Sequence, residues 1–170
     1  MKKLYLLMIV TSLVAVSCTK DNINGPDTAP VRVEKENYTF LKNAALYGTA
    51  EKKRSEEYSS PFEIVSVNRS GDTMDITVSF PAGCETNKFE VIWDGLIMES
   101  YPVQTRIFVK RNASGCAGSD ETETIVLSVD LKELIFEGND PQLKDAVITV
   151  SNASKKTGTQ NADMAASDKD

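Results

Sequence analysis

The sequence contains three cysteines and no histidine, and these two counts limit the chemistry that its side chains can perform. Histidine is the usual proton carrier near neutral pH and the usual partner of a serine or cysteine nucleophile. The thiols of Cys18, Cys84 and Cys116 are too few and too widely spaced for an all-thiolate zinc site. We therefore expect no catalytic residues, no metal site and no cofactor. An enzyme of this composition would have to use carboxylates, lysine, tyrosine or a metal held by oxygen ligands.

The first cysteine lies at the end of a predicted export signal. Residues 1–17 begin with two lysines after Met1 and continue as an apolar segment that is too short to span a bilayer as a helix. The sequence Ser17-Cys18 resembles the lipobox of bacterial lipoproteins, although Ala15 occupies a position where leucine is usual. We expect cleavage before Cys18, acylation of Cys18 and attachment to the membrane through its acyl chains. The alternative is a plain secretory signal with an incidental cysteine.

The other two cysteines enclose a pair of predicted strands. If Cys18 is acylated, Cys84 and Cys116 remain as an even pair in an oxidising compartment, which predicts a disulfide between them. Between them lie an alternating apolar run that ends at Trp93, a turn at Asp94-Gly95 and a second alternating run. This pattern is typical of a structural scaffold.

The charge of the chain argues against nucleic acid as a partner. The formal net charge is −6, and removal of residues 1–17, which hold two lysines and no acid, changes it to −8. No stretch concentrates lysine and arginine enough to neutralise a phosphate backbone.

The composition along the chain predicts five segments. They are a signal peptide (1–17), a flexible tether (18–36), a helical or irregular lead-in (37–60), a β-sandwich domain (61–151) and a disordered tail (152–170). Six or seven short alternating runs separated by turn residues predict an all-β, antiparallel, immunoglobulin-like β-sandwich. A short helix or turn is expected before its first strand.

One strand carries the candidate partner-binding face. If Ile107 and Val109 face the core, then Arg106, Phe108 and Lys110 face outward, and an aromatic flanked by cations is typical of binding surfaces. The alternative is that Phe108 is covered by the preceding helical segment or by a second sheet.

Several short motifs also occur in a fixed order: Cys84, Phe89-x-x-x-Trp93-x-Gly95, a turn at Ser100-Tyr101-Pro102, Cys116 and Asp130-Leu131-x-x-Leu134. With this pattern, residues 62–135 resemble an uncharacterised family of exported Bacteroidota lipoproteins. In that family a Gly-Gly-Cys motif is followed shortly by histidine, whereas here Ala82 replaces the first glycine and Asn87 lies near the expected histidine. The resemblance implies the location and the fold, and it implies no activity.

Two other patterns resemble signals of the same bacteria. Thr19-Lys20-Asp21, directly after Cys18, resembles their lipoprotein surface-export signal, which predicts exposure at the cell surface. Thr28 and Thr73 each follow an aspartate and precede an apolar residue, as in their O-glycosylation acceptor. We expect both threonines to lie in exposed segments.

Together these features favour an outer-membrane lipoprotein whose β-sandwich binds a protein or glycan partner without catalysing a reaction. The alternative is a carboxylate-dependent hydrolase on the same scaffold, which would need two acids in one cleft. The spacing of the acidic residues pairs no two of them, so we expect binding rather than catalysis.

Overall fold

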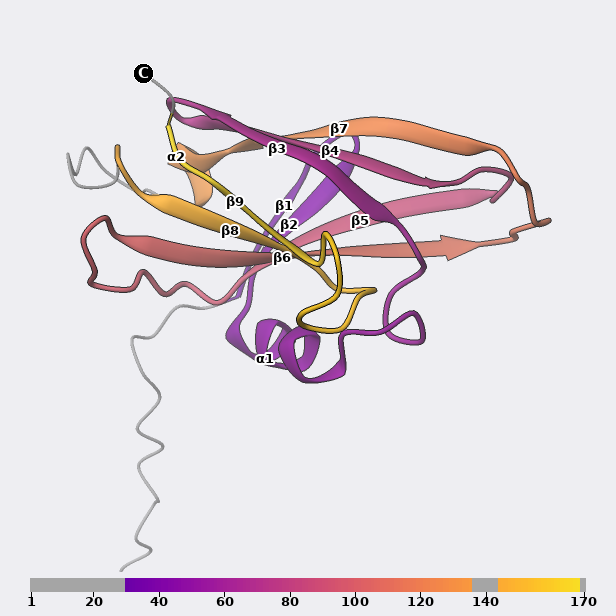
Figure 1. Ribbon diagram of the computed structural model, residues 1–170, viewed down its shortest axis with the longest axis horizontal. Coiled ribbons are helices and arrows are strands. Elements are labelled where there is room, and N and C mark those ends of the chain that lie inside the picture. Colours follow the sequence, from indigo (N-terminus) through magenta and orange to yellow (C-terminus); the bar gives the residue numbers. More distant parts are fainter. Residues whose placement is uncertain (1–29, 136–143, 169–170) are drawn as a thin grey trace, which may run out of the picture.

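The computed structural model describes residues 30–135 and 144–168, in which two β-sheets pack face to face (Figure 1). The larger sheet has the order β1 (Val31–Glu34), β2 (Tyr38–Lys42), β5 (Thr86–Trp93), β6 (Gln104–Ser114), β8 (Val147–Asn152), β9 (Asp163–Ala166). The smaller sheet has the order β3 (Glu63–Ser70), β4 (Thr73–Pro81), β7 (Thr122–Asp130). The helices are α1 (Ala44–Lys53) and α2 (Leu131–Leu134).

This architecture confirms the predicted all-β sandwich and corrects three of its details. The described residues contain nine strands rather than six or seven, and two of them precede α1, so the helix does not come before the first strand. The larger sheet is also mixed, because β2 pairs in parallel with β5 and β6 pairs in parallel with β8. Parallel neighbours need long crossover connections, and here the β2–β5 connection contains α1, β3 and β4.

The inner face of the smaller sheet is formed by strands in which buried and accessible residues alternate. On β4, Met74, Ile76, Val78 and Phe80 are buried, whereas the residues between them are at least partly accessible. The turn before β4 contains Gly71, whose φ of 58° is the left-handed conformation that glycine adopts without steric cost. The glycine in the turn and the alternation on β4 thus both suit the β3–β4 hairpin.

The larger sheet differs because both of its faces are covered. One face packs against the smaller sheet, and α1 lies on the opposite side (Figure 1). The helix begins at Asn43, whose side chain accepts a hydrogen bond of 3.0 Å from the Leu46 backbone N–H. Beneath α1 a second apolar cluster forms, made of residues from the helix, three strands and the segment after β8: Leu41, Ala50, Ile92, Phe108 and Ala153.

Both predicted flexible segments contain strands among the described residues. Strand β1 lies within the predicted tether, and β9 lies within the predicted disordered tail. The buried Arg54 holds the tail segment in place: its guanidinium donates to the carbonyls of Asn152 and Ala162 and forms an ion pair of 3.1 Å with Asp163. The polar composition of the tail concealed these backbone contacts, which require no apolar side chain.

Candidate functional site

The predicted partner-binding face is wrong, because its central aromatic is buried. Phe108 has 0% of its surface exposed and lies beneath α1, where the Tyr47 ring meets it edge-on at 5.1 Å between centroids. The Arg54 guanidinium carbon lies 5.3 Å from the centre of the same ring. Burial also raises the pKa of Tyr47 to about 12. The alternative interpretation, a phenylalanine covered by the helix, is therefore the one that the structure confirms.

The two cations of that row do not form a binding face without the aromatic. Arg106 is exposed, whereas Lys110 is partly buried, with its ammonium 3.7 Å from a Glu90 carboxylate oxygen and 4.8 Å from the centre of the Tyr58 ring. Lys110 is thus engaged by its own domain. Two other candidate functional surfaces lie at the two ends of the β5–β6 hairpin.

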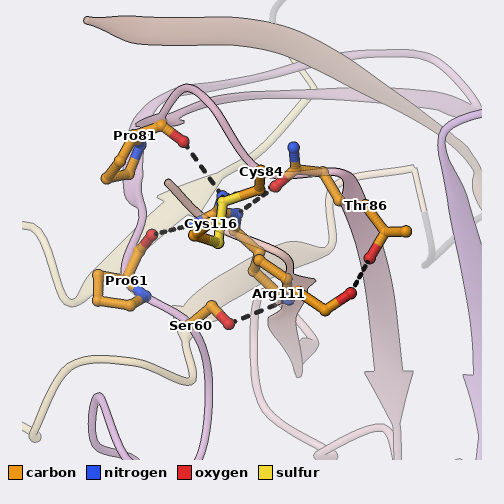
Figure 2. The surroundings of a disulfide bond; sticks show 10 residues. Ser60, Pro61, Pro81, Cys84, Thr86, Arg111 and Cys116 are labelled. Atoms are coloured by element: carbon orange, nitrogen blue, oxygen red, sulfur yellow. Dashed lines mark hydrogen bonds between the residues drawn. A yellow bond between two sulfur atoms is a disulfide. The ribbon is translucent and has the colours of Figure 1, made fainter. Parts of the chain in front are cut away.

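One end of this hairpin is closed by the predicted disulfide between Cys84 and Cys116 (Figure 2). The register of the hairpin explains the pairing: Thr86 lies opposite Ser114, and two residues further out on each side come the two cysteines. The pairing of the strands and the covalent link therefore support the same geometry.

A buried arginine lies next to this disulfide. Arg111 is only 2% exposed, and its guanidinium donates to the Asn87 side-chain oxygen at 3.0 Å and to the Pro61 and Pro81 carbonyls at 2.8 and 3.2 Å (Figure 2). It also approaches the Cys84 sulfur at 3.4 Å. Through these contacts, strand β6 is connected to the segment before β3, to the end of β4 and to the start of β5.

The direct contacts of the Arg111 guanidinium are with neutral acceptors and an aromatic ring. None of the ion pairs among the described residues involves it, and its guanidinium carbon lies 4.6 Å from the centre of the Phe80 ring. Burial lowers the pKa of Arg111, and the more distant Glu123 raises it. Arg111 was not among the predicted site residues, although it continues the core-facing row of Ile107 and Val109.

An open cleft of about 240 Å³ lies near this end of the molecule. Its lining includes Phe62, Phe80 and two carboxylates, Glu56 and Glu63. Glu63 is ion-paired with Lys155, which also lines the cleft. The cleft is where a carboxylate-dependent reaction would have to be sought on this scaffold.

The other end of the hairpin is the connection between β5 and β6, and hydrogen bonds brace it. The buried Trp93 indole N–H donates to the Thr105 hydroxyl at 2.8 Å, and that hydroxyl donates to the Leu96 carbonyl at 2.8 Å. Met98 and Gln104 form an isolated antiparallel bridge within the connection. Trp93 is therefore a core anchor, and it fixes the backbone from which the connection projects.

This braced connection exposes three large apolar side chains. The exposed fractions are 56% for Leu96, 54% for Met98 and 100% for Tyr101, and we call these three residues the apolar loop. Exposed apolar groups gathered on one segment are typical of interaction sites. The sequence gives a weak signal for them, since apolar residues between a turn and a proline also occur in buried strands.

The apolar loop lies at the end of the sheet where the described chain begins. Val31 of β1 pairs with Lys42 of β2, and Lys42 pairs with Trp93, the last residue of β5. The Lys42 ammonium lies 5.1 Å from the centre of the Trp93 ring. The first described residues therefore lie at the same end of the larger sheet as the root of the apolar loop.

Of the remaining predicted sites, Thr73 lies among the described residues. Thr73 is exposed at the start of β4, as expected for an acceptor of sugar, and its modification stays a prediction. Cys18 and Thr28 lie outside the described residues. Across the described residues there is no group of three or more acids or cysteines arranged to hold a metal ion.

Comparisons of this chain with protein-family models, with curated proteins and with solved structures give no match. The structure adds one observation on membrane association: within the described ranges, no helix is both long and apolar enough to cross a bilayer.

Proposed function

We propose that this protein is a lipid-anchored lipoprotein of the outer membrane, exposed at the cell surface, whose β-sandwich binds a protein partner through the apolar loop. Acyl chains on Cys18 hold it at the membrane, and binding rather than catalysis is its activity. The observation that carries the proposal is the full exposure of Tyr101. It lies on a connection whose backbone is braced by hydrogen bonds and which exposes two other apolar side chains.

The chemistry of the loop supports a protein partner more than a glycan. Leu96 and Met98 offer aliphatic and thioether surface without hydrogen-bonding groups, whereas sugar sites usually combine an aromatic ring with convergent polar side chains. Tyrosine contributes large contact area at low entropic cost, because it has only two rotatable side-chain bonds. The bracing by Trp93 further reduces the entropy that binding must remove.

The place of the loop supports a partner close to the membrane. The described chain begins at Pro30, beside the apolar loop, and eleven residues separate Cys18 from Pro30. Even when fully extended, this length of chain spans at most about 40 Å. An anchored domain therefore holds the loop within reach of other envelope proteins.

A crosslinking experiment tests the binding site. A photoreactive amino acid replaces Glu99, which is exposed within the loop, or Thr124, which is exposed on β7 of the other sheet. We expect a discrete crosslinked protein from position 99 in intact cells and none from position 124. Equal crosslinking at both positions would contradict the proposed site.

Substitutions of the exposed apolar residues supply the matched control. Leu96→Ser, Met98→Ser and Tyr101→Ser together should reduce the crosslinked species at least tenfold. Val65→Ser with Val126→Ser, at residues 54% and 44% exposed on the smaller sheet, should leave it unchanged. Both sets alter exposed apolar surface, so only a site-specific contact separates them.

A separate experiment tests the anchor. Cys18→Ala should move the protein from the membrane fraction to the soluble fraction, because stable attachment requires the acyl chains. Mass spectrometry of the wild-type mature protein should find acyl groups on an N-terminal Cys18. Retention of residues upstream of Cys18 in the mature protein would refute the anchor and leave the loop proposal intact.

A further inference from the structure

The two cysteines of the disulfide lie in different surroundings. Cys116 is exposed on the loop after β6, whereas Cys84 is partly buried next to the guanidinium of Arg111. Thiol–disulfide exchange requires a thiolate to reach one sulfur while the other leaves as a thiolate. Accessibility therefore selects Cys116 as the sulfur attacked and Cys84 as the leaving group.

Arg111 supplies what a leaving thiolate needs. Its charge is buried and is met by neutral acceptors, and the Cys84 sulfur lies 3.4 Å from its guanidinium. A buried cation without a counterion in direct contact is costly, and a thiolate formed at Cys84 would provide that contact. A positive group beside a cysteine stabilises its thiolate, and a stabilised thiolate leaves faster.

We infer that the Cys84–Cys116 disulfide is a thiol–disulfide exchange site, in which an external thiolate attacks Cys116 and Arg111 stabilises Cys84 as the leaving thiolate. The external sulfur bonds to the Cys116 sulfur, the bond between the two cysteines breaks, and its electron pair leaves with Cys84. A second external thiolate then displaces Cys116 from the mixed disulfide. Two external thiols are thereby oxidised to one disulfide, and the protein is reduced by two electrons.

The rim of the site favours a neutral or cationic thiol. Glu85 lies against Gly115, next to Cys116, and Asp120 and Glu121 are exposed on the loop that follows. These carboxylates repel an anionic attacking molecule more strongly than a neutral one, and salt weakens the difference. The natural reactant is thus expected to carry its thiol on a molecule without net negative charge.

The first test locates the attacked sulfur in the unmodified protein. The mature protein is exposed briefly to 2-mercaptoethanol, quenched in acid, alkylated and mapped by mass spectrometry. We expect at least a tenfold excess of the mixed disulfide at Cys116 over that at Cys84. The same protein in concentrated urea, where both sulfurs are accessible, should show a ratio near one.

The second test separates an exchange site from a purely structural bridge. An exchange site should be reduced faster in the folded protein than in urea, because only the fold places Arg111 beside Cys84. A structural bridge should be reduced more slowly when folded. Equal attack on both sulfurs, or slower reduction of the folded protein, would overturn the inference.

Substitution of the arginine tests its part in the reaction. Arg111→Met should slow reduction of the folded protein at least tenfold, and Arg111→Lys, which keeps a positive charge, should slow it less. Arg106→Met changes an exposed arginine of the same strand and should have no effect. If Arg111→Met fails to fold, the site of attack and the folded-to-unfolded rate ratio of the wild type still decide the question. For cysteamine, 2-mercaptoethanol and 3-mercaptopropionate, the rate constant per thiolate, divided by its value for the protein in urea, should decrease in that order. The opposite order would refute the acidic rim.

Discussion

The two ends of the β5–β6 hairpin are stabilised by different means. At one end a covalent bond joins Cys84 to Cys116, and a buried guanidinium fills the space beneath it. At the other end no covalent bond exists, and the backbone is held by the indole of Trp93 and the hydroxyl of Thr105. The disulfide end contains a buried charge, whereas the loop end exposes apolar side chains.

This difference shows how one supersecondary unit can present two kinds of chemistry. The buried Arg111 contributes only if its neutral acceptors stay in place, so the disulfide end depends on precise tertiary packing. The apolar loop needs only a fixed backbone, because its side chains contact few neighbours. Substitutions at the two ends should therefore differ in their effect on stability, and four predictions measure that difference.

The largest effect is expected at Arg111. Arg111→Met removes hydrogen bonds to Asn87 and to two proline carbonyls and leaves these acceptors without their donor. We expect a loss of about 3 to 4 kcal/mol in the free energy of unfolding, measured by urea denaturation. Arg106→Met should change it by less than about 0.5 kcal/mol. Similar losses for the two variants would refute the structural role of the buried guanidinium.

Removal of the disulfide should cost slightly less. Cys84→Ser with Cys116→Ser should lower the free energy of unfolding by about 3 kcal/mol, because the unfolded chain regains the entropy of an open loop. If Arg111 stabilises a Cys84 thiolate, the reduced wild type should be more stable than this double variant above pH 8. Equal stability of the two at that pH would weaken the exchange inference and leave the disulfide itself unaffected.

At the opposite end the expected loss is smaller. Trp93→Phe removes the indole N–H that donates to the Thr105 hydroxyl and leaves a partly filled space. We expect a loss of about 2 kcal/mol. Hydrogen exchange at the Met98 and Gln104 amides should accelerate, since their bridge is braced by this contact. Unchanged exchange there would show that the loop holds its shape without Trp93.

The smallest expected effect is a gain in the free energy of unfolding rather than a loss. Asp94 accepts a hydrogen bond of 2.9 Å from the Leu96 N–H, and burial raises the pKa of its carboxyl above the usual value. A raised pKa in the folded state means that protonation favours folding, so this contribution is present at low pH and is lost as the pH rises through the folded-state pKa. Asp94→Asn, which keeps the acceptor, should therefore be more stable than wild type at pH 7. The difference should disappear near pH 3, and a difference independent of pH would contradict the assignment.

Local patterns in the sequence predicted much of this hairpin. The alternation around Trp93 and the turn at Asp94-Gly95 depend on neighbouring residues, and the cysteine pair followed from the count of cysteines. The structure has the strands, a positive φ at Gly95 and the disulfide where they were expected. The alternation on β4 was equally informative, because one face of the smaller sheet is accessible to solvent. In such a strand the period of two reports directly which side chains face the core.

The larger sheet shows where this reasoning stops. Once α1 covers the second face of the larger sheet, odd and even positions of a strand are both buried. Alternation then no longer separates core positions from surface positions. Phe108 was therefore assigned to the surface, and the parallel pairing of β2 with β5 and of β6 with β8 left no local signal.

The sequence by itself determined the all-β class, the hairpins and the pairing of the cysteines, because these depend on residues close together in the chain or opposite each other in one hairpin. Only the tertiary structure decided that Phe108 is core, that Arg111 is a buried cation beside Cys84 and that the Leu96–Tyr101 connection is exposed. Each of these depends on which distant segment covers a side chain, and burial by a distant segment leaves no periodic mark in the sequence.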